Sequence, residues 1–212
     1  PVGEYAVSLL IEDQYGKFPL GALLDPNGKS IPARVDAYRR LLESLDLEGA
    51  DTEALVWALV DWIDNDSEGD RYEYNQRFTV PNAPVVHLDE ISRIEVYRDL
   101  RPEHLRRILA RLDTRSDPTV NVNTASEPVL LALHPDLSAE DAKTLREKLA
   151  DTPDANGSVI TPYIPVTGRA FPVAFQSKRF RVIARGDAGG VVREADCLVV
   201  RDRGKKKCRV LD

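Results

Sequence analysis

The hydrophobic period of this chain changes twice along its length, and this change constrains the fold more than any other feature. Near both ends, at residues 4–11 and 180–211, apolar and polar side chains alternate with a period of two, which is typical of strands. Between them, residues 33–150 repeat apolar side chains every three or four positions, as amphipathic helices do. We therefore predict an α+β fold in which a large helical block is inserted into an antiparallel sheet whose strands come from both ends of the chain. Two consecutive independent domains are the alternative.

The expected elements follow from the same pattern. The opening strand should end in a hairpin turn at Asp13–Lys17, which leads to a second extended segment at Phe18–Leu20. Residues 151–168 are rich in proline, glycine, aspartate and threonine and mark a boundary, beyond which a glycine-rich turn at residues 186–190 predicts a meander of strands. Apolar stripes predict about six helices, placed around residues 35–45, 55–63, 88–97, 105–112, 124–134 and 138–150.

The most patterned stretch is V-N-V-N-T-A-S-E-P-V-L-L, from Val120 to Leu131. Its alternating valines and asparagines predict a short extended segment. Thr124 and Glu127 have the spacing of a capping box, in which each side chain bonds to the backbone N–H of the other residue, so a helix should begin there. Ser138 and Asp141 have the same spacing and should begin a second helix. The stretch is thus expected to continue into a pair of short helices.

The composition is that of an ordinary folded protein, with 42% hydrophobic and 30% charged residues. The formal net charge of −6 argues against a protein whose main partner is nucleic acid, because neutralising phosphates requires a basic face. No run approaches the roughly 18 apolar residues that span a bilayer. We expect no membrane segment and no signal peptide within this sequence, and Pro1 in place of an initiator methionine indicates a fragment or a processed form.

The two cysteines, Cys197 and Cys208, flank a turn signal at Asp202–Lys205. If the flanking segments pair as a hairpin, the two thiols lie near one another across the strands, where a disulfide can form. A disulfide would fit an oxidising compartment such as the periplasm. Two separate thiols are the alternative.

Carboxylates alternate with other residues in the segment D-N-D-S-E-G-D, from Asp64 to Asp70, which follows directly on a predicted helix. Gly69 stands at the sixth position and permits a sharp bend, as in the first half of a calcium loop. The twelfth position is Asn75 in place of the bidentate glutamate of an EF-hand, so Glu73 or nearby carbonyl groups would have to complete the site. A calcium site and a solvated acidic turn both remain open.

No catalytic motif accompanies these features. His87, His104 and His134 lie in separate segments without a neighbouring nucleophile and are expected to be surface or capping residues. No serine has the G-x-S-x-G context of an activated nucleophile. The residues therefore offer no case for catalysis comparable to the acidic segment, and a metal-dependent hydrolase is kept only as a third alternative.

Four separated segments share motifs in a fixed order with one known family. They are E-D-Q-Y-G-K-F-P-L within Tyr5–Leu24, D-W-I-D-N-D at Asp61–Asp66, P-N-A-P at Pro81–Pro84 and V-N-V-N-T-A at Val120–Ala125. In this combination the chain resembles the K-type minor pseudopilin of bacterial type II secretion systems, general secretion pathway protein K. The resemblance covers most of the chain, and the ordered combination is more specific than any single motif.

The resemblance implies a pilin-like antiparallel sheet domain formed by residues 1–28 and 156–212, with an all-α domain of residues 29–155 inserted between its strands. The helix pair would be the helix-hairpin-helix or SAM-like portion of that domain. The family's hydrophobic N-terminal helix, which anchors the precursor in the inner membrane, is absent from this sequence, which would be the periplasmic part. The resemblance also implies a structural calcium ion bound by Asp64, Asp66, Glu68 and Asp70.

The implied function is that of a structural protein without enzymatic activity at the tip of the pseudopilus. There it would bind the I- and J-type minor pseudopilins and other pseudopilins, but no nucleic acid, and would support pseudopilus initiation and protein secretion across the outer membrane. The alternative is a helix-hairpin-helix DNA-binding protein of the competence type. Against that alternative, the predicted hairpin at residues 133–139 lacks glycine, and Asp136, Glu140 and Asp141 would repel phosphate.

Overall fold

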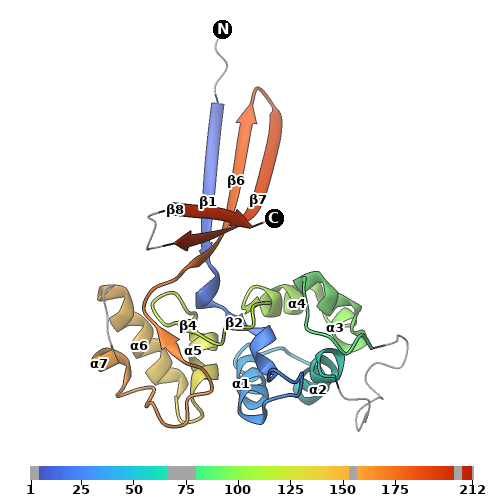
Figure 1. The fold of residues 1–212 in the computed structure, drawn as a ribbon, viewed down its shortest axis with the longest axis vertical. Helices are drawn as coiled ribbons and strands as arrows, with labels where there is room; N and C mark the ends of the chain where they lie inside the picture. The colour runs from blue at the N-terminus through green and yellow to red at the C-terminus, as the bar shows by residue number, and fades with distance from the viewer. Residues whose placement is uncertain (1–4, 66–79, 153–156, 203–206, 212) are drawn as a thin grey trace. The chain divides into compact units, whose positions relative to one another are not determined.

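The computed structural model describes residues 5–65, 80–152, 157–202 and 207–211, and it divides the chain into two compact units (Figure 1). We call residues 1–15 with 176–212 the sheet unit, and residues 16–175 the helical unit. The predicted α+β fold, with a helical block inserted between strands from both ends of the chain, is confirmed.

The helical unit begins at residue 16 and ends at residue 175, whereas it was expected to begin at residue 29 and to end at residue 155. The reason is packing. Phe18, Leu23 and Phe171 belong to segments that were expected in the sheet domain, yet their side chains are buried in the core of the helical unit. Both flanking segments therefore fold with the helices.

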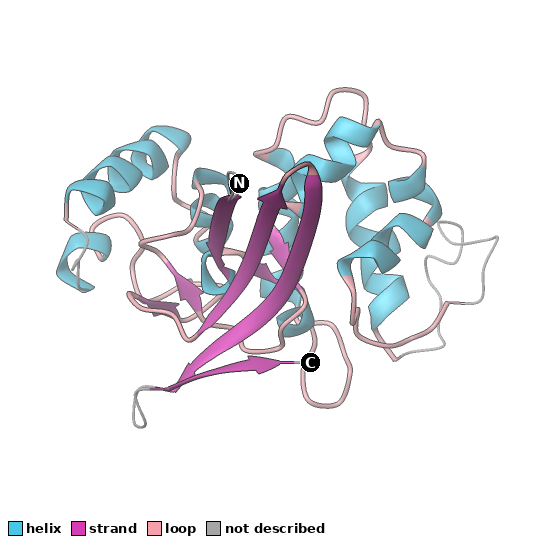
Figure 2. Ribbon diagram, turned by 90° about the horizontal axis from the view of Figure 1, so that it is seen from above, coloured by secondary structure: helices cyan, strands magenta, loops and turns pink. Residues whose placement is uncertain are grey.

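The sheet unit is a four-stranded antiparallel sheet with the strand order β1-β6-β7-β8. Figure 2 shows the strands as a twisted sheet. The N-terminal strand pairs along its whole length with the first strand of the C-terminal meander, so that Leu9 lies opposite Ala184. The strands are β1 (Tyr5–Asp13), β6 (Arg179–Ala188), β7 (Val191–Asp202) and β8 (Lys207–Leu211).

The turn between β6 and β7 is tighter than expected. Only Gly189 and Gly190 lie between the strands, and both have positive φ angles, of 60° and 89°. Such angles strain residues with a side chain, which explains the paired glycines. Asp187 accepts a hydrogen bond from the N–H of Gly190 at 3.1 Å and closes the turn.

The helical unit contains seven α-helices among its described residues, and its core is continuous. The helix expected at residues 88–97 is instead a 3-10 segment, η4 (Leu88–Arg93), followed by one helical turn. The other expected helices are confirmed. The α-helices are α1 (Pro32–Glu43), α2 (Thr52–Ile63), α3 (Glu95–Arg98), α4 (Pro102–Leu109), α5 (Glu127–Leu133), α6 (Ala139–Asp151) and α7 (Gly157–Ile160).

The predicted hairpin turn after the first strand is wrong. A 3-10 turn, η1 (Gln14–Gly16), follows β1, and β2 (Phe18–Pro19) pairs in parallel with β3 (Leu112–Asp113) of the helical unit. The cause is the burial of Phe18, whose ring packs against the ring of Phe171 with centroids 5.1 Å apart. A second short parallel ladder joins β4 (Val120–Asn121) to β5 (Val173–Ala174).

Two buried tyrosines connect three helices of the core. The hydroxyl groups of Tyr38 in α1 and Tyr97 in α3 are 2.7 Å apart, and the hydroxyl of Tyr97 donates to the carbonyl of Leu55 in α2 at 2.9 Å. Burial raises the pKa of both phenols, because the charged form would lose its hydration. Both tyrosines are therefore neutral hydrogen-bonding groups at physiological pH.

None of the helices that the structure describes is both long and apolar enough to cross a membrane.

Candidate functional site

The acidic segment begins at the end of α2, and only its first two residues are described. Asp64 is 7% exposed, and its N–H donates to the carbonyl of Val60 at 2.9 Å, as the last helical bond of α2. The N–H of Asn65 donates to the carbonyl of Gly28 at 3.1 Å, which fixes the start of the segment against a neighbouring turn. The other expected calcium ligands, Asp66, Glu68 and Asp70, lie outside the described residues. Within the described part of the chain, no cluster of three histidine, cysteine or carboxylate residues could hold a metal.

The V-N-V-N-T-A stretch is a structural junction. Asn121 is 3% exposed, its carbonyl accepts the N–H of Ala125 at 3.0 Å, and its side chain accepts the N–H of Asn123 at 3.2 Å. The amide of Asn123 donates to the carbonyl of Phe175 at 2.9 Å, and Arg146 of α6 donates to the carbonyl of Asn123 at 2.9 Å. Asn121 thus fixes the local turn, and Asn123 joins this stretch to the residue after β5 and to α6.

The predicted capping box between Thr124 and Glu127 is wrong. The hydroxyl of Thr124 lies 3.4 Å from the carbonyl of Asn121, and α5 begins three residues later, with Ser126 as its N-cap. The carbonyl of Asn121 competes for the threonine hydroxyl, as happens often for short polar side chains near a turn. By contrast, the predicted start at Ser138 is confirmed, since its side chain accepts the N–H of Asp141 at 3.1 Å.

Arg115 also stabilises this junction, although no motif in the sequence marks it. Its side chain is buried beside Asp113, at 3.4 Å, and donates to the carbonyls of Lys17 at 3.0 Å and Thr119 at 2.9 Å. Asp113 and Thr119 lie within four residues of Arg115, whereas Lys17 lies 98 residues away, so no local pattern in the sequence could have identified the long-range contact. Arginine is rarely buried unless it is paired, so the buried and paired side chain of Arg115 indicates a structural role.

Two backbone donors of the hairpin between α5 and α6 are bonded within the chain, and one of them is the N–H of Leu137, which donates to the carbonyl of His134 at 3.3 Å. The N–H of Asp136 donates to Nδ1 of His134 at 3.2 Å, and Nε2 of His134 lies 3.0 Å from the carbonyl of Thr167. His134 is 4% exposed and is the C-cap of α5, which fits the expectation of a capping residue, whereas His104 is 6% exposed within α4 and is neither a surface nor a capping residue. His87 is exposed and precedes η4 as its N-cap. The structure does not bring the three histidines into one site.

The charge distribution also disfavours phosphate binding by the helix pair. The helical unit, which contains the pair, has 18 lysine and arginine residues against 27 aspartate and glutamate residues. The sheet unit has 11 basic and 8 acidic residues. The negative charge of the chain therefore belongs to the helical unit, where a DNA backbone would be repelled.

The two cysteines lie in one hairpin but do not meet. Both thiols are free in the structure, and the register of β7 with β8 places Cys208 opposite Arg201, four residues from Cys197. Because strands rise about 3.3 Å per residue, an offset of four residues exceeds the reach of a disulfide. The expected disulfide is therefore not present in this register.

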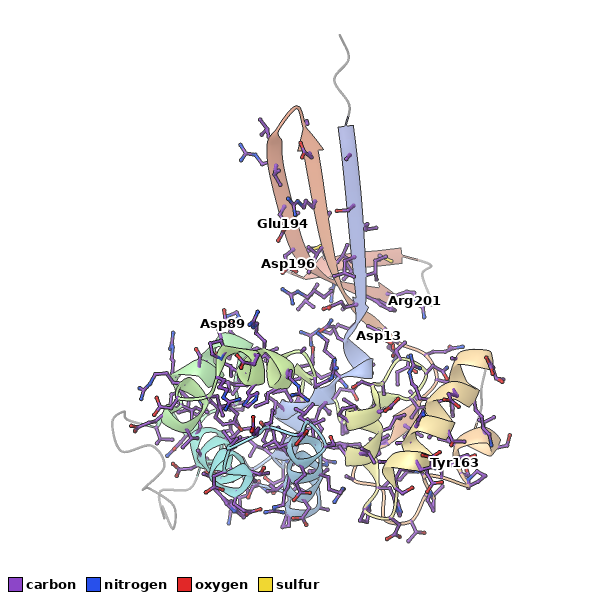
Figure 3. All side chains as sticks on the ribbon, turned by 180° about the vertical axis from the view of Figure 1, so that it is seen from behind. Asp13, Asp89, Tyr163, Glu194, Asp196 and Arg201 are labelled. Atoms are coloured by element: carbon purple, nitrogen blue, oxygen red, sulfur yellow. The ribbon has the colours of Figure 1, made fainter. Side chains whose placement is uncertain are left out.

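The faces of the four-stranded sheet differ in chemistry. We call the apolar face the one that the strand register gives Val7, Leu9, Ile11, Phe180, Val182, Ala184, Val191, Ala195, Cys197, Val199 and Val210, together with the charged residues Asp13, Arg193 and Arg201. The opposite, polar face carries an ion pair between Arg181 and Asp196, with side-chain atoms 2.5 Å apart. Figure 3 labels Glu194 and Asp196 on β7. The hydrogen bond from Arg181 lowers the pKa of Asp196.

The comparisons with known proteins point to one family. Residues 16–114 and residues 120–147 match family models that are both described as "Type II secretion system (T2SS), protein K". Together these matches cover more than half of the chain. Over 131 residues the chain is 30% identical to type II secretion system protein K of Pseudomonas aeruginosa. This match covers 58% of the chain but only 38% of the length of that relative.

A solved structure extends the similarity to both units. The crystal structure of the GspK-GspI-GspJ complex from the type II secretion system of enterotoxigenic Escherichia coli matches 100% of this chain and 80% of the matched chain, with a TM-score of 0.66 and 18% sequence identity. At that identity the match shows a shared fold. The DNA-binding alternative finds no support in these matches. Because two family models of protein K together match residues 16–114 and 120–147, the chain belongs to the protein K family of type II secretion systems.

Proposed function

We propose that this chain is the periplasmic part of a minor pseudopilin that acts at the tip of the type II secretion pseudopilus. There it binds the I- and J-type minor pseudopilins and supports pseudopilus initiation and protein secretion across the outer membrane. It acts as a structural component and not as an enzyme, and a membrane-anchoring N-terminal helix outside the present sequence holds the whole protein in the inner membrane. The observation that carries this proposal is the pair of family matches, one over residues 16–114 and one over residues 120–147, which includes the V-N-V-N-T-A stretch.

The two-unit architecture supports this role. A regular antiparallel sheet is a unit that can join a filament of related subunits, and the helical unit is a bulky addition that the filament shaft does not need. The helical unit would then project from the tip and block the addition of a further subunit above it. Crosslinks that place the helical unit along the filament shaft would count against this arrangement.

Secretion by a cell tests the role directly. A strain that lacks its own protein K should lose secretion of its type II substrates to the medium. The full-length protein that contains this chain should restore secretion, whereas the same protein without residues 16–175 should not. Restoration by the shortened protein would show that the helical unit is unnecessary and would contradict the proposal.

We also propose that the segment that begins at Asp64 binds calcium as a structural ion. Calcium prefers carboxylate and carbonyl oxygens, and Asp64 and Asn65 offer such donors at a fixed position after α2. Calcium that binds only the folded chain should raise the melting temperature, and the combined change Asp64→Ala and Asp66→Ala should abolish this rise. Glu103→Ala, in the exposed first turn of α4, is the matched control. An equal rise in the double variant would remove these residues from the site.

A further inference from the structure

His134 joins the hairpin between α5 and α6 to the loop that follows α7, residues 161–169 (Figure 1). Its Nε2 lies 3.0 Å from the carbonyl oxygen of Thr167, 33 residues away in the chain. Beside it, the N–H of Ala170 donates to the carbonyl of Leu133 at 3.0 Å. The imidazole is therefore enclosed between two segments of the helical unit, and only 4% of its surface is exposed.

The two contacts of the ring determine which nitrogen carries the proton. The N–H of Asp136 lies 3.2 Å from Nδ1 of His134 and can only donate, so Nδ1 accepts this bond and carries no proton. The proton of the neutral ring is then on Nε2, which donates to the carbonyl of Thr167. Both nitrogens of the neutral imidazole are thus bonded, and the structure fits this form of the side chain.

A second proton would break one of these bonds. It must bind at Nδ1, because Nε2 already carries the first proton. The new N–H would then face the N–H of Asp136, and two donors cannot share a hydrogen bond. Histidine is the side chain that ordinarily changes its charge between about pH 5 and 8, so this conflict can arise close to neutral pH.

The ring itself has little freedom to avoid the conflict. The φ angle of Gly168 is 87°, and a Cβ at this position would lie 2.9 Å from Nε2 of His134, so the backbone of the loop lies close against the ring. Leu133 and Leu137, on either side of the hairpin, are buried. Pro135 and Asp136, in contrast, are exposed. The peptide group between these two residues is therefore the part that can turn and direct its N–H to water.

The carboxylate of Asp136 is in position to accept the new proton. It lies 3.8 Å from Nδ1 of His134, and its side chain is 88% exposed and can move. A negative charge at this distance favours the charged form of the imidazole. One contact can therefore replace the other, because the N–H of Asp136 leaves Nδ1 and its carboxylate binds the proton there.

The other charged groups on the surrounding elements are bonded elsewhere. They are Arg40 of α1, Arg169 of the loop and Asp141 of α6. Both arginines donate to backbone carbonyls of α5 and of the loop, at 2.9 to 3.0 Å, and would disfavour a further positive charge. Asp141 accepts the hydroxyl of the serine that caps α6 at 2.7 Å. Among these groups, Asp136 is the one placed to stabilise a proton on His134.

From this geometry we propose that the hairpin between α5 and α6 is a pH-sensitive joint. When the pH falls below neutral, Nδ1 of His134 takes a proton from water, releases the N–H of Asp136 and binds the carboxylate of Asp136. The bond from Nε2 to Thr167 stays, so the hairpin opens locally while the loop remains attached. The proposal does not depend on the role in secretion, because it rests only on contacts within the helical unit.

Nuclear magnetic resonance of the nitrogen-15-labelled chain tests the proposal directly, because the sequence contains only three histidines. The pH is lowered from about 8 to about 5.5, a range in which exposed aspartates stay charged. We expect the ring nitrogens of His134 to change from the neutral form with a proton on Nε2 to the charged form. The amide signal of Asp136 should shift with them, and its protection against hydrogen exchange should fall about tenfold.

Three variants separate this response from other effects of acid. His134→Asn keeps an acceptor oxygen near the position of Nδ1 but cannot gain a proton, so the amide of Asp136 should stay protected over the whole range. Asp136→Asn removes the carboxylate and should move the response to lower pH. His87→Asn is the matched control, because His87 is the exposed N-cap of η4, and the amide of Asp136 should respond in it as in the unchanged chain.

A ring of His134 that stays neutral down to pH 5.5 in the folded chain overturns the proposal. So does a ring that becomes charged while the protection of the Asp136 amide is unchanged, or a response that is lost in the His87→Asn variant. If circular dichroism shows that His134→Asn is unfolded, the ring and amide signals of the unchanged chain decide, since they require no variant.

Discussion

At the scale of single residues, close backbone contacts determine where a side chain is tolerated. Gly21 lies where the segment after β2 crosses the segment after β3. A Cβ at this position would be 2.8 Å from the carbonyl oxygen of Thr114 and 3.0 Å from that of Arg115. Neither neighbour is a flexible side chain, so the backbone itself would have to move.

We therefore expect Gly21→Ala to lower the free energy of unfolding by about 1–3 kcal/mol, the usual cost of overpacking. Gly157→Ala is the control, because nothing lies within 4 Å of its Cβ position and it begins α7. That change should be neutral or stabilising by up to about 1 kcal/mol. Urea unfolding measures both. If both changes altered the free energy of unfolding by the same amount, an added methyl group would not strain the contact at Gly21.

The tyrosine pair gives a second prediction at this scale. Tyr97→Phe removes the hydroxyl that Tyr38 contacts, and it should cost about 1–2 kcal/mol of unfolding free energy because a buried hydroxyl loses its partner. Tyr163→Phe, which affects a partly exposed hydroxyl near Lys148, should cost less. A smaller loss for Tyr97→Phe than for Tyr163→Phe in thermal or urea unfolding would contradict this account.

The same pair predicts a response to alkaline pH. The folded pKa of both phenols is raised above the ordinary value of 10.0, so their contribution to stability is complete below that value. It is lost as pH rises above 10, because the unfolded chain then releases protons that the folded chain keeps. Tyr97→Phe should reduce the slope of stability against pH in this range. An unchanged slope would show that the buried pair does not control alkaline unfolding.

At the scale of elements, two serines at helix starts differ in their bonding and provide a matched comparison. Ser138 caps α6 by accepting the N–H of Asp141 at 3.1 Å. Ser126 precedes α5, but its side chain makes no cap bond, and its buried hydroxyl has no partner. We expect Ser138→Ala to cost about 1 kcal/mol and Ser126→Ala to cost almost nothing. Equal costs in urea unfolding would contradict the assignment of the caps.

Elements could be predicted from the sequence where a local pattern determines them. The periods of two and 3.6 identified β1, the C-terminal strands and helices such as α1 and α2, because apolar stripes must face a core. The cap at Ser138 followed from a local spacing. The cap predicted at Thr124 from the same spacing was wrong. The carbonyl of Asn121 competes for the hydroxyl of Thr124, and this contact exists only in the folded backbone.

Pairings between distant segments could not be predicted in the same way. The parallel ladders β2–β3 and β4–β5 contain two residue pairs each and join segments far apart in the chain. No hydrophobic period marks so short a ladder. The register of β7 with β8 separates Cys197 from Cys208. The turn residues between these strands do not determine that register, so it could not be predicted from them. Of the candidate calcium site, the described structure contains only Asp64, so the site stays a prediction.

At the scale of the whole molecule, the two units differ in burial and in charge. The helical unit contains the hydrophobic core, the junction around Asn121 and most of the acidic residues. The sheet unit is slightly basic, and the apolar side chains of Val7, Leu9 and Ile11 in β1 are exposed. This division suits the central claim of the proposed function, that the chain assembles with the I- and J-type minor pseudopilins at the tip of the pseudopilus.

The most direct test of that claim is the assembly of this chain with its proposed partners. The periplasmic parts of the I- and J-type pseudopilins from the same organism are mixed with the chain at micromolar concentration, and the mass of the product is measured by light scattering during size-exclusion chromatography. We predict one complex that contains one copy of each protein. Elution of the chain apart from the two pseudopilins, with all three proteins folded, would contradict the assignment to the pseudopilus tip.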